Sequence, residues 1–227
     1  IRGEEDFRRR VNAAKPHSAT MGKINYVVWS DVFHCTECGQ EFPYWDLVFR
    51  GPGLPPPVEL FCPNCSVVLT NKTMERSWIT KFDHELHATI TQAKQVPVFI
   101  NYSVGTKRYE KYPDERDISL LQELDKKSLP NNIPVVELPD GFNTEQPKKS
   151  HGFTHVHHFF TRRNLSAMSE LWGAINNQDD PIIRDAALYV FTGCIQRVCK
   201  LNRYMPVHDR HVGPLSGTLY VSQITAE

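Results

Sequence analysis

The sequence predicts an α+β protein, with a mixed sheet, several helices toward the C-terminal end and a small inserted ribbon that contains four cysteines. Two Cys-x-x-Cys pairs in the first third of the chain mark the ribbon. Segments rich in β-branched and aromatic residues predict the strands, and apolar residues at helical spacing predict the helices. With 227 residues, 40% hydrophobic and 23% charged, the chain can bury a substantial core.

In the first third, the composition of residues 4–14 predicts a short amphipathic helix. Residues 24–30, with the sequence INYVVWS, are expected to form a buried strand that leads into the first cysteine pair. Aromatic residues predict another strand over residues 42–49, and the Pro- and Gly-rich residues 51–59 predict a loop. Residues 67–82 are expected to return as one or two strands, with a helix in their second half as the alternative.

The middle of the chain predicts a strand pair over residues 97–112, where two alternating runs flank Gly105. Residues 115–127 are expected to be helical. Residues 128–152 contain four prolines and predict a long polar connection. Residues 152–160 are then expected to form a further strand.

The last third is more regular. Residues 162–175 have apolar side chains at helical spacing. Asp180 is expected to cap the next helix, whose first turn accommodates Pro181. Residues 217–224 predict a final strand. An apolar stripe on the second helix is expected to lie in the core, and its members are Ile183, Ala187, Val190, Cys194, Val198 and Leu201.

These elements divide the chain into residues 1–30, the first helix and strand of the main domain, residues 31–70, the inserted ribbon, and residues 71–227, the rest of the main domain. No run approaches the roughly 18 to 20 apolar residues that a membrane helix needs. We therefore expect a cytoplasmic protein without membrane contact. The chain begins at Ile1 within a charged segment, so we expect it to be a piece of a longer protein.

The four ribbon cysteines have the spacing of a zinc site. The pairs Cys35-Thr-Glu-Cys38 and Cys62-Pro-Asn-Cys65 are separated by 23 residues, close to the spacing at which two knuckles supply four thiolates to one tetrahedral zinc ion. Four thiolates leave no coordination position for water, so the metal is expected to be structural. A redox-active pair and a rubredoxin-like iron site are the alternatives.

Four histidines, His151, His155, His157 and His158, form a second cluster. Alternation along a strand places His155 and His157 on one face, and a second metal site is the functional interpretation of that placement. No acidic residue stands at a matching interval, so histidines that line a polar groove are the favoured interpretation. The sequence has no Gly-rich nucleotide-binding turn, nucleophile elbow or His-Glu-x-x-His helix, and no catalytic or cofactor-binding residue is predicted.

The charges cancel over the whole chain but not locally. The 26 basic and 26 acidic residues argue against a protein that coats nucleic acid through net charge. Arg162 and Arg163 open one predicted helix, and residues 184–211 carry five basic residues against two acidic ones. Such an excess is typical of a surface that faces phosphates, and basic residues that complement the end of a helix are the alternative of equal weight.

Several strings, taken together, resemble one group of bacterial DNA methyltransferases that modify adenine N6 or cytosine N4. They are GKINYVVWSDVFHCTECG, FCPNCSVVLT, QAKQVPVFINYSVGTKRYEK, GFTHVHHFFTRRNL, QRVCKLNRY and PLSGTLYVSQI. In that family the S-adenosylmethionine-binding turn precedes the corresponding segment and the Asp-Pro-Pro-Tyr/Phe catalytic motif follows it. This sequence contains neither. The resemblance therefore implies the middle, target-recognition-like segment, with S-adenosylmethionine bound only by the full-length parent.

Together, the resemblance and the charge pattern imply that the parent flips the target base while this segment grips the flanking DNA. The expected phosphate contacts are Arg162, Arg163, Lys200 and Arg203, with Lys148 and Lys149 as weaker candidates. The expected partners are DNA, the rest of the parent methyltransferase and a restriction subunit. The alternative function is a zinc-stabilised protein–protein interaction module without direct contact to DNA.

Overall fold

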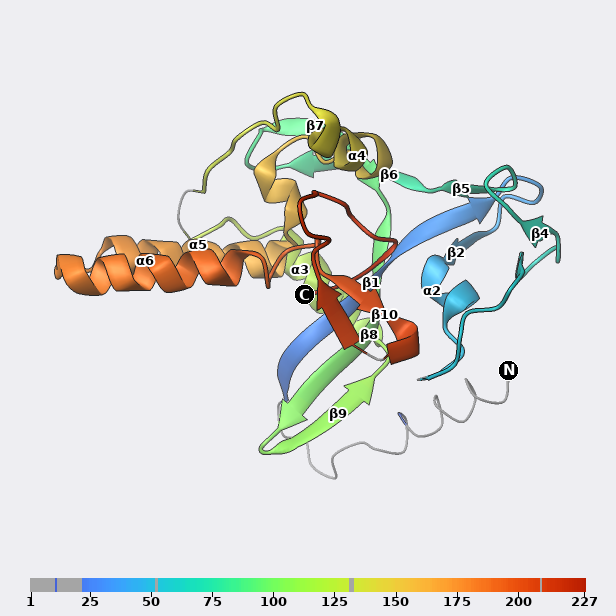
Figure 1. Cartoon of the computed structure of the whole chain (residues 1–227), viewed down its shortest axis with the longest axis horizontal. Coiled ribbons are helices and arrows are strands. Elements are labelled where there is room, and N and C mark those ends of the chain that lie inside the picture. The colour runs from blue at the N-terminus through green and yellow to red at the C-terminus, as the bar shows by residue number, and fades with distance from the viewer. Residues whose placement is uncertain (1–10, 12–21, 52, 131–132, 209) are drawn as a thin grey trace.

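The computed structural model describes residue 11 and residues 22–51, 53–130, 133–208 and 210–227. These residues form an α+β structure with an antiparallel sheet and five α-helices (Figure 1). The helix predicted over residues 4–14 lies outside the described residues apart from Val11, which is buried in the main core. None of the helices in the described ranges is long and apolar enough to cross a membrane.

One long strand, β1 (Lys23–Cys35), organises the sheet. Its sheet partners are β2 (Glu41–Pro43), β5 (Met74–Arg76), β8 (Gln95–Val104), β9 (Lys107–Lys111), β10 (Arg203–Met205), β11 (Arg210–Gly213) and β12 (Ile224–Ala226). The main order is β11-β10-β12-β1-β8-β9, while β2 and β5 pair with the far end of β1. Two separate hairpins are β3 (Leu60–Phe61) with β4 (Val68–Leu69), and β6 (Trp78–Asp83) with β7 (Ala88–Ala93). Every pair among these strands is antiparallel, which corrects the predicted mixed sheet.

Strand β1 is buried over most of its length. Between Val27 and Phe33 only Trp29 is not fully buried, which is the pattern of a strand covered on both faces. The predicted strand over residues 24–30 is thus confirmed and extends to Cys35. The strand pair predicted around Gly105 is also present, and the φ of +60° at Gly105 closes its turn.

Residues 42–49 are predicted as a strand, but most of them form helix α2 (Tyr44–Val48). Trp45, only 2% exposed, turns into the main core, where its ring stacks on Phe49 at 4.1 Å between centroids. The backbone N–H of Trp45 donates to Oγ of Ser30 at 2.9 Å. Packing of these aromatic rings decides the local structure here against their strand propensity.

A smaller core lies outside the main sheet and includes Phe153 and Phe159. The helices in the second half of the chain are α3 (Glu115–Asp125), α4 (Phe142–His151), the 3-10 helix η1 (Val156–Phe159), α5 (Arg162–Asn176) and α6 (Pro181–Ile195). The helices predicted over residues 115–127 and 162–175 are confirmed. Two other predictions are wrong: α4 lies within the predicted polar connection, and η1 replaces the strand predicted over residues 152–160.

Helices α5 and α6 form a hairpin that projects from the body of the molecule (Figure 1). As predicted, Asp180 caps α6 by accepting from the backbone N–H groups of its first turn. The predicted burial of the apolar stripe is wrong: Ile183 is 53% exposed, Val190 is 64% exposed, and no residue of α6 is fully buried. This follows because α6 projects with α5, where the rings of Trp172 and Phe191 pack at 5.5 Å.

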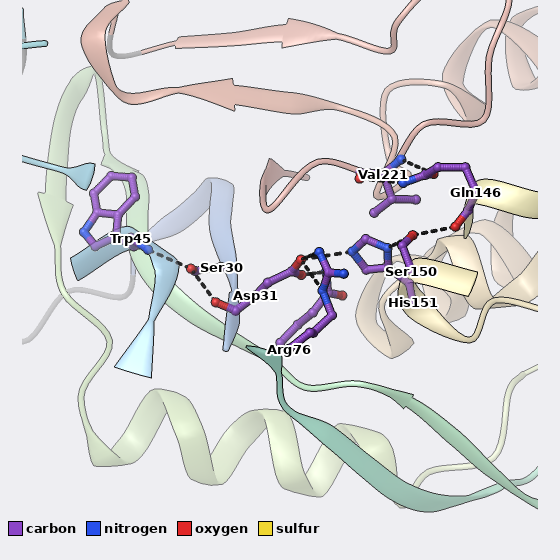
Figure 2. A network of polar contacts seen from close by, with 9 residues as sticks. Ser30, Asp31, Trp45, Arg76, Gln146, Ser150, His151 and Val221 are labelled. Atoms are coloured by element: carbon purple, nitrogen blue, oxygen red, sulfur yellow. Dashed lines mark hydrogen bonds and ion pairs between the residues drawn. The ribbon is translucent and has the colours of Figure 1, made fainter. Parts of the chain in front are cut away.

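Asp31, on β1, is the buried centre of a polar network (Figure 2). Its carboxylate accepts from Nε and Nη2 of Arg76 on β5 at 3.0 and 2.9 Å, and from Nε2 of Gln95 on β8 at 2.9 Å. Nε2 of His151, at the end of α4, lies 3.1 Å from the same carboxylate. One fully buried carboxylate thus connects the central strand with three other elements.

We predict that Asp31→Asn lowers the free energy of unfolding by about 3–5 kcal/mol, because it leaves the positive charge of Arg76 without its buried partner. Denaturant unfolding followed by circular dichroism measures this change. Asp140→Asn is the matched control, since Asp140 also pairs with a basic side chain, that of Lys148 at 2.8 Å, but is fully exposed. The control should leave the stability almost unchanged. An equally small effect of Asp31→Asn would contradict the central role of this carboxylate.

Candidate metal centre and basic cleft

The two cysteine pairs form turns with the same backbone geometry. The N–H of Cys35, at the end of β1, donates to the carbonyl oxygen of Gln40 at 3.0 Å. The N–H of Cys62, which follows β3, donates to the carbonyl oxygen of Val67 at 2.9 Å. Each turn therefore holds its first cysteine at a strand end, with the second cysteine at the tip.

The residue after each pair completes the turn. The N–H groups of Gly39 and Ser66 donate to the carbonyl oxygens of Cys35 and Cys62, at 2.8 and 3.0 Å. Gly39 has a φ of +72° and Ser66 a φ of +61°. The left-handed conformation is ordinary for glycine but strained for serine.

The turns bring all four sulfur atoms within 4.8 Å of one another. Sγ of Cys35 lies 3.8 Å from Sγ of Cys65, and Sγ of Cys38 lies 3.6 Å from Sγ of Cys62. A tetrahedral site with metal–sulfur bonds of about 2.3 Å has sulfur–sulfur edges of about 3.8 Å. The four predicted ligands are therefore close enough to bind one metal ion.

The electrostatics of the four sulfurs favour a cation between them. The backbone N–H of Gln40 and the side chain of Asn64 lower the pKa of Cys38 to about 6. The backbone N–H of Val67 acts in the same direction on Cys65, but desolvation and the neighbouring sulfurs outweigh it and raise the pKa of Cys65 to about 12. A bound cation would let all four sulfurs be thiolates at once.

A second group of potential metal ligands consists of Asp83, on β6, and two of the predicted histidines, His157 and His158. Nε2 of His157 and Nε2 of His158 each lie 2.9 Å from Oδ2 of Asp83, and all three residues are buried. Oδ1 of Asp83 accepts from the backbone N–H groups of Glu85 and Leu86, at 2.9 and 3.0 Å. Although burial opposes it, these hydrogen bonds hold the pKa of Asp83 well below its usual range.

His158 is a hydrogen-bond donor in this group. Its Nδ1 accepts from the backbone N–H of Thr154 at 3.1 Å, so the neutral ring carries its proton on Nε2, which faces Asp83. Burial and the charge of His157 lower the pKa of His158 to about 4, which keeps the ring neutral at pH 7. A protonated Nε2 has no lone pair for a metal, so this geometry favours a His–Asp–His hydrogen-bond group over a second metal site.

The structure divides the four predicted histidines. His151 contacts Asp31, away from the others, whereas His155 has its ring 5.7 Å from that of His157 and 5.5 Å from that of His158. The predicted strand alternation of His155 and His157 is wrong, because η1 turns the chain at this point.

Asp83 and the two buried histidines line a cleft of about 580 Å³, whose walls include β6, β7, α3 and the start of α5. Its basic residues are Lys81, Lys126, Arg162, Arg163 and Lys200, and its acidic residues are Asp83, Glu85 and Asp125. The lining thus carries a net charge of +2. Lys81 and Lys126 are exposed and form no ion pair with any described residue.

Three of the six predicted DNA contacts come together in this cleft. Nη1 of Arg162 pairs with Oε1 of Glu85 at 2.6 Å, and Nη2 of Arg163 donates to the backbone oxygen of Glu227 at 3.1 Å. Nζ of Lys200 lies 4.9 Å above the ring of Phe153, and burial followed by the charge of Lys81 lowers the pKa of Lys200 to about 8. These three residues therefore share one pocket with the histidine group.

The other three predicted DNA contacts lie elsewhere. Lys148 and Lys149 are on α4, not on a loop, and pair with Asp140 at 2.8 Å and Glu145 at 2.5 Å. Nε of Arg203 donates to the carbonyl oxygen of Gly213 between β10 and β11, at 3.3 Å. The structure does not bring these three side chains to the cleft.

Sequence analysis missed the residues that the chain brings to the cleft from other elements. Asp83 is 74 positions from His157, and no local interval could connect them. Lys81 shares the alternating strand of Asp83, and this spacing is the one signal that could have placed both on the same face.

We predict that Ser66→Gly raises the free energy of unfolding by a few tenths to about 1 kcal/mol, because it relieves a left-handed serine. Gly39→Ala is the reciprocal control and should lower the free energy of unfolding. An added Cβ would meet no atom within 4 Å, so the left-handed φ of Gly39 is the sole cause of the expected loss. Denaturant unfolding at saturating metal, with the metal content of each variant, measures both. A less stable Ser66→Gly would show that the serine hydroxyl makes a contact that the turn needs.

The chain thus has a four-cysteine centre that can hold a metal ion and a separate basic cleft built around Asp83. Comparisons of the chain with protein-family models, with curated proteins and with solved structures find no match. The chemistry of these two sites is therefore what bears on function.

Proposed function

We propose that the four cysteines bind one zinc ion with a structural role. The sulfur spacing fits a tetrahedral ion, and an all-sulfur donor set favours zinc. Four protein ligands would fill the coordination shell, so the ion would bind no substrate. Because Cys35 ends β1, the ion would tie the β3–β4 hairpin to the central strand of the sheet.

We further propose that the chain is the DNA-contacting, target-recognition segment of a larger DNA methyltransferase of the group it resembles. The observation that carries this proposal is the basic cleft, with its excess of positive charge and its unpaired lysines. The parent would supply the S-adenosylmethionine site and the catalytic motif, both of which this sequence lacks. The chain itself would act by binding and orienting DNA.

The chemistry of the cleft suits a nucleic acid. Lysine and arginine side chains that reach solvent supply most of the attraction to the phosphate backbone. Lys81 and Lys126 have this exposure, and Phe82, 52% exposed, lines the same cleft. An exposed aromatic ring beside cations provides a surface on which an unpaired base can stack.

A protein-interaction module is the second candidate function, and helix α6 is the observation that favours it. Ile182, Tyr189 and Val190 are 79%, 82% and 64% exposed. Large apolar side chains gathered on one projecting helix are typical of a surface that another protein covers. The rest of the parent or a restriction subunit would be that protein.

The zinc proposal predicts one zinc ion per chain in protein purified without added metal, measured by elemental analysis. Cys38→Ser should abolish this zinc and unfold at least the cysteine lobe, because metal-binding free energy is folding free energy in such lobes. Cys194→Ser, on α6 and outside the site, is the matched control and should keep the metal. Full zinc content and stability in Cys38→Ser would refute the site, and iron in place of zinc would correct the metal.

The DNA proposal predicts salt-dependent DNA binding that weakens when Lys81 and Lys126 are both changed to Gln. Loss of two phosphate contacts should flatten the slope of log K against log salt by roughly 2. Fluorescence anisotropy with a labelled duplex at several salt concentrations measures it.

The charge-matched control changes Lys148 and Lys149 to Gln, since both lysines already pair with carboxylates on α4 or beside it. An equal loss of DNA affinity in the control would show that the DNA contacts α4 as much as the cleft. Absence of DNA binding by the zinc-loaded chain would favour the interaction module.

A further inference from the structure

The basic cleft contains buried hydrogen-bond donors that no described group satisfies. Nε1 of Trp29 on β1 and Nε2 of Gln92 on β7 are buried without a partner, and both residues line the cleft. Nδ1 of His157, a third lining residue, is also without a partner. The Nδ1 of His157 is an acceptor when Nε2 donates to Asp83. Buried polar groups are nearly always hydrogen-bonded, so the two N–H donors of Trp29 and Gln92 at one cleft point to a ligand that supplies the missing acceptors.

Two lysines converge on the same space. Lys81 and Lys200 both line the cleft. Burial, followed by the positive charge of Lys81, lowers the pKa of Lys200 to about 8. Neither forms an ion pair with a described carboxylate. Two like charges without a directly paired carboxylate repel each other, and a bound anion would reduce that repulsion.

The acidic residues of the cleft do not form an ion pair with Lys81 or Lys200. Oδ1 and Oδ2 of Asp83 already accept four hydrogen bonds, two from the backbone and two from histidines. Glu85 pairs with Arg162. Asp125 acts on Lys81 and Lys200 through its charge, but pairs with neither. Glu227 and Asp31 also act on Lys200 through their charge, but neither pairs with it. The two lysines and the two neutral N–H donors are therefore left without a directly bound acceptor among the described residues.

We propose that Trp29, Gln92, Lys81 and Lys200 form a binding site for a phosphate-class anion. A phosphate group offers several oxygen acceptors in different directions, which matches an indole N–H, an amide and two ammonium groups. The cleft volume is in the range of pockets that hold whole small molecules, so there is room for the remainder of a phosphate ester. The phosphate would come from the DNA backbone, in which case the site deepens the proposed function and rests on it, or from a small phosphorylated molecule.

The test measures binding of inorganic phosphate to the zinc-loaded full chain by phosphorus NMR or calorimetry. Trp29→Phe keeps the ring and removes the N–H, and Gln92→Leu keeps the size and removes the amide. Each should weaken phosphate binding about tenfold or more, the effect of losing one hydrogen bond to a charged group. Gln122→Leu, an exposed glutamine of the same cleft, is the matched control and should bind phosphate like the unaltered chain.

Stability gives an independent readout. If the two donors await a ligand, their removal should leave the free energy of unfolding unchanged or higher, since each variant deletes an unsatisfied buried group. Clear destabilisation with unchanged phosphate affinity would show a structural role and overturn the proposal. Absence of phosphate binding by the unaltered chain would overturn it as well.

Competition with a short single-stranded oligonucleotide separates the two sources. Displacement of phosphate by DNA from the unaltered chain, with weaker DNA binding in Trp29→Phe and Gln92→Leu, would identify the backbone phosphate as the ligand. Phosphate binding without displacement would support the pocket with a small phosphorylated ligand and count against the proposed DNA function. DNA binding and phosphate binding that both variants retain in full would uphold the DNA function and overturn the phosphate site.

Discussion

The arrangement of this molecule depends on the need to satisfy one buried negative charge. Asp31 is fully buried, and a carboxylate removed from water is costly unless cations and donors surround it. Arg76, Gln95 and His151 meet that need from β5, β8 and α4. Because the three partners come from different parts of the chain, these elements can take only one arrangement around the carboxylate. Burial of a charge here specifies position more than it adds stability.

The metal centre and the cleft are connected through the same region. Cys35 lies four residues beyond Asp31 on β1, about 13 Å along the strand. It pairs with Met74 of β5, and the chain continues almost directly from β5 into β6, which carries Lys81 and Asp83. An ion held by the cysteines would therefore also hold the start of the strand that forms one wall of the cleft. A structural metal would in this way influence the shape of a site that it does not touch.

Features that depend on short intervals could be predicted from the sequence, and features that depend on distant contacts could not. The Cys-x-x-Cys spacing, the turn at Gly105 and the Asp180 cap are local, and the structure has each of them. The cleft is assembled from residues as distant as Trp29 and Lys200. Asp83 lies 75 positions from His158, so it could not be assigned to its histidines. Residues 42–49 and α6 show a further limit of prediction from sequence. Apolar composition indicates that a segment favours burial, but it does not indicate which surface the segment contacts.

The sequence separations in the Asp31 network also bear on the order of folding. Cys35 and Cys65, which contact each other, are 30 positions apart in the sequence. Asp31 and His151 are 120 positions apart. Closing the longer loop costs about 1.2 kcal/mol more in chain entropy, and such non-local contacts form late. The cysteine lobe can therefore form while the Asp31 carboxylate is still hydrated. The Asp31 carboxylate then loses its water when α4 docks, because that step places His151 beside it.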